Sequence, residues 1–179
     1  MDATFLKGRV WVLLDREGRL IEDIDTDQIF HNAHLHITDR AQMGPLALGN
    51  LEGWKDFPQK TRPGDLVVAG RNFGAGSSRQ QAVDCFIALG TAAVLAPSFS
   101  AIYFRNAVNS GFPVLRVLNL GTLAREGRLR SGDEVEIEAA AGTGRNVTSG
   151  AVFEVLPMSR VQWEIHRAGD LFKYGKMGG

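Results

Sequence analysis

The chain has 179 residues, 44% of them hydrophobic, and its 20 basic and 20 acidic side chains give a formal charge of zero at pH 7. This length supports one well-buried core, so we expect a single domain over residues 1–179 with a frayed tail at 171–179. The balanced charge excludes a long-range field that would favour nucleic acid or an anionic membrane. Because the sequence contains no run of eighteen apolar residues and no charged-then-apolar leader, we expect a soluble, cytoplasmic protein with no membrane or nucleic-acid partner.

The first elements are predicted to be a strand and a short capped helix. Residues 8–14 (GRVWVLL) are typical of a strand, and residues 15–18 of a turn. Residues 23–27 carry acids at alternate positions, a pattern that also suits a hard cation. No glycine and distal glutamate complete a calcium loop, so we interpret the stretch as a solvated turn that caps a short helix at Gln28.

The segment from residue 31 to 38 contains three histidines, a residue type that binds zinc. His31, His34 and His36 do not share one face of a helix, and only the last two share one side of a strand. No acid or cysteine is placed to complete a tetrahedron, so we predict no metal site.

Residues 40–60 lack a clean period, and Gly44-Pro45 excludes one continuous helix. The segment carries too many apolar side chains for a plain linker: Met43, Leu46, Leu48, Leu51, Trp54 and Phe57. We therefore predict either short helical turns that lie over the fold or a flap that orders against a partner.

The central stretch combines a buried strand at 66–69, a glycine-rich turn at 70–76 and a helix that we expect to begin at Ser77. We predict that Ser77 caps this helix, because its hydroxyl can accept from the free amides of the first turn. These amides, the close backbone approach that glycines permit and the planar fork of Arg79 together suit a carboxylate. The stretch is therefore a candidate anion site with a hydroxyl at its centre, although an ordinary capped strand–turn–helix explains the same pattern. It lacks the lysine of a P-loop and the third glycine of a dinucleotide site.

The single cysteine, Cys85, lies on the apolar side of this helix and is interpreted as a small core residue. An iron–sulfur cluster requires several thiolate ligands. The chain therefore cannot hold such a cluster alone.

The later elements predict a parallel sheet followed by a β meander. Strands are expected at 92–96 and 112–115, with a helix from Phe99 to about Asn109 that Ser98 caps and Gly111 closes. Alternating strand and helix patterns over 66–117 favour a parallel sheet with right-handed crossovers. The clean alternation at 134–138 and the turn-separated segments after it indicate a meander. A final helix capped by Ser159 is expected to place Val161, Ile165 and Ala168 on one face.

Four motifs occur in order: D-T-D-Q-I at 25–29, K-T-R-P-G-D at 60–65, N-F-G-A-G-S-S-R at 72–79 and S-F-S-A-I-Y-F-R-N-A at 98–107. They resemble the motifs of the small subunits of 3-isopropylmalate dehydratase (isopropylmalate isomerase) in the aconitase superfamily, and the resemblance extends from about residue 8 to 171. It implies the swivelling β/β/α fold of aconitase C-terminal domains. We therefore expect an α/β protein with a mostly parallel core sheet, flanking helices and a β meander.

The resemblance also implies a hydro-lyase of leucine biosynthesis that isomerises 2-isopropylmalate and 3-isopropylmalate by dehydration and rehydration. Such a chain is active only with a large subunit, which carries the [4Fe-4S] cluster. By this resemblance, Ser77 takes the substrate proton, amides near Ser78 hold the oxyanion and Arg79 binds a substrate carboxylate. Asp27 matches an aspartate that lies near the active site of the assembled enzyme.

Two departures from the family pattern bear on pKa tuning, subunit contacts and substrate. Gln80 and Gln81 stand where the family usually has Glu-His. His36 and Ile37 stand where two residues help to select the substrate, often one of them an arginine. Ile37 suits a branched alkyl group and His36 is cationic only when protonated, which favours isopropylmalate over homocitrate. A homoaconitase small subunit, another hydroxy-diacid dehydratase and a non-catalytic carboxylate-binding module remain alternatives.

Overall fold

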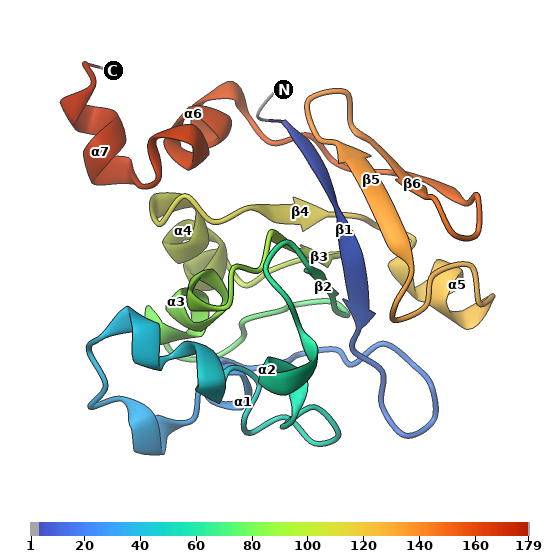
Figure 1. Ribbon diagram of the computed structural model, residues 1–179, viewed down its shortest axis with the longest axis horizontal. Helices are drawn as coiled ribbons and strands as arrows, with labels where there is room; N and C mark the ends of the chain where they lie inside the picture. The colour runs from blue at the N-terminus through green and yellow to red at the C-terminus, as the bar shows by residue number, and fades with distance from the viewer. Residues whose placement is uncertain (1–3, 179) are drawn as a thin grey trace.

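Strand β1 (Phe5–Val12) lies near the centre of a seven-stranded sheet and joins its parallel half to its antiparallel half (Figure 1). The computed structural model describes residues 4–178. The first part of β1 pairs antiparallel with β5 (Glu134–Glu138), and its last three residues pair parallel with β2 (Leu66–Val68). One strand therefore carries both kinds of ladder.

The other strands extend the two halves of the sheet in the order β4-β3-β2-β1-β5-β6-β7. The parallel half adds β3 (Ala93–Ala96) and β4 (Val114–Arg116), and the antiparallel half adds β6 (Thr143–Asn146) and β7 (Val152–Glu154). The α-helices are α1 (Thr26–Ile29), α2 (Phe57–Lys60), α3 (Gln81–Ala88), α4 (Ala101–Asn109), α5 (Leu120–Arg125), α6 (Arg160–Ala168) and α7 (Leu171–Lys176). The predicted α/β class, with parallel core and β meander, is confirmed.

Apolar side chains fill both faces of the parallel strands, which is why these strands are apolar without alternation. Val67 belongs to a cluster with residues of α3 and α4 on one face. Leu66 and Val68 point the other way, into a cluster that includes residues of α5 and α6. Figure 1 shows α3 and α4 on the side of the sheet away from α5.

The segment from 40 to 60 forms the short helical turns that were one of its two predicted forms. They are two 3₁₀ turns, η2 (Arg40–Gln42) and η3 (Gly44–Leu46), followed by α2. Four of the apolar side chains, Met43, Leu48, Leu51 and Phe57, are buried in the core on the α3 side. The segment is thus a cover for the fold within this chain.

Two predicted helix starts are wrong, because tertiary contacts occupy the expected caps. Helix α3 begins at Gln81 rather than Ser77, since the loop before it is held against α1, where Thr26 Oγ1 donates to the Ser77 carbonyl at 2.9 Å. Helix α4 is capped by Ser100 rather than Ser98. The Ser98 hydroxyl instead accepts the amide of Asn72 at 2.9 Å.

The C-terminal region is more ordered than predicted. Ser159 caps α6 through a reciprocal pair of hydrogen bonds with Gln162, as expected, but the buried side chains are Trp163 and Ile165, whereas Val161 is 51% exposed. The expectation of a frayed tail at 171–179 is wrong for residues 171–176, which form α7. Two contacts stabilise this helix: the Asp170 cap, and the bond from the Tyr174 hydroxyl to Glu164 at 2.9 Å. Residue 179 lies outside the described residues.

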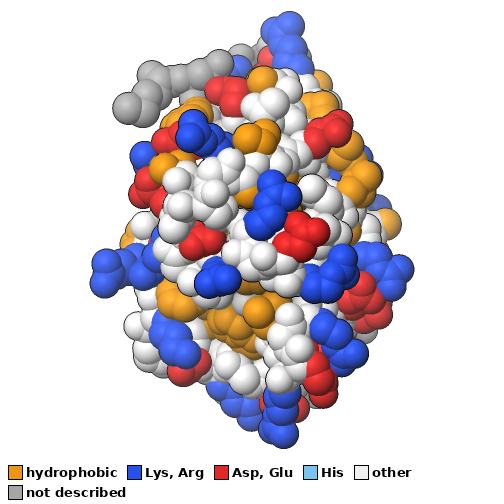
Figure 2. Space-filling model, turned by 90° about the vertical axis from the view of Figure 1, so that its right-hand side faces the viewer, with side chains coloured by type: hydrophobic (Ala, Val, Ile, Leu, Met, Phe, Trp, Pro, Cys, Tyr) orange, Lys and Arg blue, Asp and Glu red, His pale blue; other side chains and the backbone are white. Residues whose placement is uncertain are grey.

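The surface of the antiparallel half carries interspersed charges. Figure 2 shows acidic and basic side chains mixed over this face, with an apolar patch in its lower half. A mixed surface of this kind has no single-sign field. Among residues 4–178, no helix has both the length and the apolar character needed to cross a bilayer.

The loops after β1, β2 and β3 meet at the carboxyl edge of the parallel strands. Phe73 anchors the middle loop, because it is fully buried and its ring packs edge-on against Tyr103 of α4 at 5.1 Å. The next residue is Gly74, with a φ of +79°, and a Cβ there would lie 2.2 Å from the Tyr103 ring. The tyrosine ring thus occupies the space that any other residue at 74 needs.

Gly74→Ala should therefore destabilise the fold by about 3 kcal/mol or more, since it adds a steric overlap to a left-handed backbone. Gly18→Ala is a matched control, because Gly18 has a similar φ of +77° but open space around it. The control should cost only about 1 kcal/mol. Denaturant unfolding of both variants measures the difference. Equal losses in the two variants would exclude close packing of the loop on Tyr103.

Candidate active site

The glycine-rich loop and the start of α1 are joined by main-chain hydrogen bonds. Gly74 N donates to Ile24 O at 2.8 Å, and Thr26 N donates to Ala75 O at 2.9 Å. These bonds form a short parallel bridge between two loops that are far apart in sequence. They place residues 77–79 beside Asp27.

Arg79 uses one nitrogen to join the loop to α1. Its Nη1 donates to Asp27 Oδ1 at 2.7 Å and to the Phe30 carbonyl at 3.0 Å, and the arginine side chain is only 16% exposed. Within the described residues, Nε and Nη2 have no partner. The other side of the guanidinium therefore keeps two donors for a carboxylate in bidentate geometry.

Both oxygens of the Asp27 carboxylate accept hydrogen bonds from donors of the same chain. Oδ1 also accepts the amide of Asn32 at 2.9 Å, and Oδ2 accepts Asn50 Nδ2 at 3.0 Å. The hydrogen bond from Arg79 is the largest cause of a lowered Asp27 pKa, and the Asn32 amide adds to it, so the carboxylate is ionised. The sequence identified Asp27 and Arg79, but not Asn50.

The main chain from 76 to 81 presents unpaired donors. Within the described residues, the amides of 76–81 donate to no carbonyl or side-chain acceptor. Gly76 turns the chain here with a φ of +87°. Ser77 and Ser78 are both exposed, and Ser78 Oγ accepts Asn106 Nδ2 at 3.1 Å, from the last of the four sequence motifs. The loop thus combines two exposed serine hydroxyls with successive N–H groups that have no acceptor in the described residues, and such N–H groups can hold an anion.

The histidine segment lies next to this loop. Residues Asn32–His34 form the 3₁₀ turn η1, and Gln81 Nε2 reaches the Leu35 carbonyl at 3.4 Å. His36 is exposed, whereas Ile37 is half-buried and packs against the core on the α3 side. Of the two residues expected to select the substrate, His36 is therefore freer than Ile37 to contact it.

The structure explains the amide of Gln80 at a position where the family usually has an acid. Its Nε2 donates to Ser110 Oγ at 2.7 Å and to Asp84 Oδ1 at 3.2 Å, and Asp84 also pairs with Arg40 at 3.0 Å. An acid at 80 would place a second negative charge beside Asp84, whereas the amide donates to it. This network fixes η2 against α3.

Cys85 is not placed to bind a metal. Its side chain is fully buried and its burial raises the pKa of the thiol, which keeps it protonated. Within residues 4–178, no three His, Cys, Asp or Glu side chains come close enough to hold an ion. The donor set of the described residues therefore does not fit an iron–sulfur cluster.

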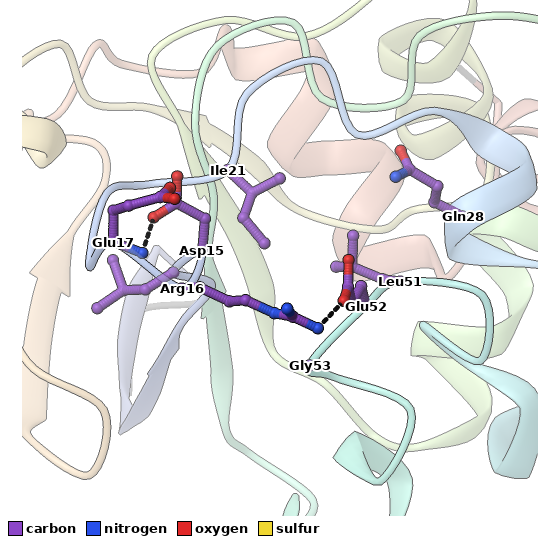
Figure 3. A pocket seen from close by; sticks show the side chains of 9 residues that line it. Asp15, Arg16, Glu17, Ile21, Gln28, Leu51, Glu52 and Gly53 are labelled. Carbon is purple, nitrogen blue, oxygen red and sulfur yellow. Dashed lines mark hydrogen bonds and ion pairs between the residues drawn. The ribbon is translucent and has the colours of Figure 1, made fainter.

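A hollow of 490 Å³ lies next to α1 but is not part of this constellation. It is lined by Leu14, Asp15, Arg16, Glu17, Ile21, Gln28, Leu51, Glu52 and Gly53. Figure 3 shows the Arg16–Glu52 ion pair in it and Gln28 at its edge. Gln28 is the one residue of the D-T-D-Q-I motif that lines the hollow. Ser77, Ser78 and Arg79 are not among its lining residues.

The comparison with known families agrees with this geometry. Residues 21–119, which contain every residue of the constellation, match the model of the aconitase C-terminal domain. The chain belongs to the aconitase C-terminal domain family. The resemblance found in the four motifs is thereby confirmed.

Relatives within the aconitase C-terminal domain family match over nearly the whole chain. The 3-isopropylmalate dehydratase small subunit of Pyrobaculum aerophilum is 40% identical over 96% of this chain and 97% of its own length. That of Thermodesulfovibrio yellowstonii is 36% identical, over 96% and 94%. The isopropylmalate/citramalate isomerase small subunit of Methanocaldococcus jannaschii is 33% identical, over 97% and 95%. A crystal structure of 3-isopropylmalate dehydratase from that organism superposes with a TM-score of 0.82 and 31% identity, covering 97% of this chain and 94% of that one.

Arg79→Gln should raise the Asp27 pKa toward its ordinary value of 3.8, because it removes the charged donor. Since the folded-state pKa is lowered, the pair stabilises the fold above about pH 4, and this contribution is lost as pH falls through the folded pKa. Carboxyl ¹³C NMR titration measures the change. The control is Arg71→Gln, which breaks an exposed pair with Glu22 in the same loop and should leave Asp27 unchanged. An unshifted Asp27 in Arg79→Gln would contradict the pairing.

Proposed function

We propose that this chain is the small subunit of a hydro-lyase that interconverts 2-isopropylmalate and 3-isopropylmalate by dehydration and rehydration, and that it works in the cytoplasm with a large subunit. The supporting observation is the loop at 76–81, which carries amides without acceptors in the described residues, the exposed Ser77 and an arginine, Arg79, that is bonded through Nη1 alone. The relatives named above as small subunits support the same assignment, and the matches cover 94% and 97% of their length.

Ser77 is proposed to take the proton from the carbon next to a substrate carboxylate. A serine hydroxyl is a weak base and acts only as an alkoxide that nearby dipoles stabilise. The amides of 76–81 are available for this, because no acceptor within the described residues occupies them. The same donors, near Ser78, can hold the negative charge that develops on the substrate carboxylate in the transition state.

Arg79 is proposed to bind the carboxylate next to the reacting carbon. Asp27 and the Phe30 carbonyl hold Nη1, which leaves Nε and Nη2 as a fixed pair of donors. A bidentate contact of this kind orients the acidic proton toward Ser77. In this proposal Asp27 acts through the arginine, because its own oxygens are already bonded.

The leaving hydroxide requires a Lewis acid. We propose that the large subunit supplies it from a [4Fe-4S] cluster, since this chain has one cysteine, Cys85, which is buried. The exposed serines then form one half of an active site that the partner completes. This division explains why Ser77 faces solvent in the isolated chain.

His36 and Ile37 are proposed to face the part of the substrate that varies. Ile37 presents an apolar surface from its half-buried position, and His36 is exposed next to it, a pair that suits an isopropyl group. The name of the Methanocaldococcus jannaschii relative includes citramalate, which carries a methyl group in place of isopropyl. Citramalate is therefore a substrate to test alongside isopropylmalate.

The proposal is tested by co-expression with the large subunit, cluster reconstitution and a panel of hydroxy diacids. Formation of the unsaturated intermediate is followed by ultraviolet absorbance. We expect isopropylmalate to be turned over with a higher kcat/KM than homocitrate. The absence of turnover with every member of the panel would reject the proposed function.

Ser77→Ala should lower kcat of the assembled enzyme by about 10²-fold or more, because the base is lost. Its effect on stability should stay within about 0.5 kcal/mol, because the side chain is exposed and does not cap α3. Steady-state kinetics and denaturant unfolding measure the two effects. Near-normal turnover would remove Ser77 from the reaction.

Arg79→Lys should raise KM about tenfold or more, because an ammonium cannot pair with Asp27 and also offer a planar fork to the substrate. A fall in kcat is expected as well, if the substrate loses its orientation. Arg71→Lys provides the control, since Arg71 is exposed in the same loop and its side chain pairs, within residues 4–178, with Glu22 alone. If both variants keep the parental kcat/KM, Arg79 does not bind substrate.

A further inference from the structure

Asn50 is bonded to the carboxylate that holds the candidate substrate-binding arginine. Its Nδ2 donates to Asp27 Oδ2 at 3.0 Å, whereas Oδ1 of the same carboxylate accepts Arg79 and the Asn32 amide. Asn50 comes from the 40–60 cover and belongs to none of the four sequence motifs. The contact therefore joins a third segment to the site.

The turn that carries Asn50 is held in a strained conformation. Leu48 has a φ of +57°, which is uncommon for a residue with a branched side chain. Its side chain is nevertheless fully buried, and its amide donates to the Ile29 carbonyl at the end of α1 at 2.8 Å. Strain of this kind persists only where the surroundings impose it, and it is frequent at functional sites.

The same turn is fixed on its other side. Leu51 is buried, Trp54 Nε1 donates to the Leu14 carbonyl at 3.1 Å, and residues 51–53 form one wall of the hollow in Figure 3. Asn50 thus projects from a rigid support. A donor on such a support can set the orientation of its acceptor.

The orientation of Asp27 decides which atoms of Arg79 remain available. With Asn50 on Oδ2, the carboxylate cannot rotate without breaking that bond, so Oδ1 stays on Nη1. Without Asn50, Oδ2 loses its partner and the Asn32 amide on Oδ1 is the remaining main-chain restraint, so the carboxylate can turn until Oδ2 accepts from Nε or Nη2. Each such arrangement removes a donor from the side that faces a substrate.

We propose that Asn50 is a positioning residue that fixes the Asp27 carboxylate, so that Arg79 keeps Nε and Nη2 free for a substrate carboxylate. This inference rests on the proposed role of Arg79. It adds a function for the cover segment, which supports the site as well as closing the core.

The first test uses the isolated chain and needs no catalysis. Asn50→Leu removes the donor at similar volume, and the Asp27 pKa, followed by carboxyl ¹³C NMR, should rise because a hydrogen bond to the charged form is lost. The matched control is Gln42→Leu, which removes an amide-to-carboxylate bond to Asp39 from the same segment without touching Asp27. The control should leave the Asp27 titration unchanged.

The second test uses the assembled enzyme. Asn50→Leu should raise KM for isopropylmalate roughly tenfold with a smaller change in kcat, the split expected when substrate orientation by a charged group is weakened. Gln42→Leu should keep the parental values. Denaturant unfolding of both variants checks that any loss of stability is shared and does not explain the difference in KM.

Asn50→Asp gives a signature that general destabilisation does not produce. At about pH 8 the new carboxylate repels Asp27 and competes for Arg79, so KM should rise more than in Asn50→Leu. Toward about pH 5 the new acid, its pKa raised by Asp27, gains a proton and donates as Asn50 does, so the ratio of variant to parental KM should fall. Within the described residues, the other groups that act electrostatically on Asp27 are Arg79 and His31, and both are present in variant and parent, so the ratio of the two KM values isolates the change at position 50.

The outcomes separate the two proposals. An Asp27 pKa in Asn50→Leu equal to that of the parent would overturn the role of Asn50, as would an active assembled enzyme whose KM is unchanged in the same variant. If the parent turns over no substrate, the proposed function fails, and the titration of the isolated chain still decides whether Asn50 fixes Asp27.

Discussion

The site depends on the main-chain bridge between residues 24–26 and 74–75. Hydrogen bonds between two loops cost nothing in side-chain entropy, and they fix both the distance and the direction of the residues after each loop. On one side these residues include Asp27, and on the other they are 77–79. The ion pair between Asp27 and Arg79 is short because the backbone has already brought its two ends together.

The polar groups at the site have two roles: the inner groups hold Arg79 in place, and the outer groups are free to bind a ligand. The inner contacts of Arg79, to Asp27 and the Phe30 carbonyl, satisfy one nitrogen and hold the guanidinium in a partly buried position. The outer donors and the amides of 76–81 face away from the core without acceptors in the described residues. The donors of such a surface bind an anion most strongly when a second protein excludes water from them, because screening weakens exposed charges. This arrangement supports the proposal that a partner subunit completes the site.

Much of the fold could be predicted from local patterns. The alternation at 134–138 and the apolar run at 66–69 gave correct strands, and Ser159 as a cap gave a correct helix start, because each depends on neighbours within a few residues. The start of α3 was wrong since Thr26, about fifty residues earlier in the chain, holds the Ser77 carbonyl. Motif spacing also located the serines and Arg79. Asn50 was missed because the turn that aims it depends on Leu48, whose backbone angle results from core packing and leaves no periodic signal.

The double pairing of β1 has a consequence for how the chain reaches this structure. Val10 pairs with Leu66, but Phe5 pairs with Glu138. The first half of β1 therefore has no pairing partner until three-quarters of the chain has been synthesised. Long sequence separation between paired strands slows folding, because the loop must close before the pairing compensates for it. Until then the open edge of β1 can accept strands from other chains, which favours aggregation. We expect the nascent polypeptide to complete the parallel half of the sheet first and the meander last. The pairing of β1 with β5, which joins the two halves, therefore forms late.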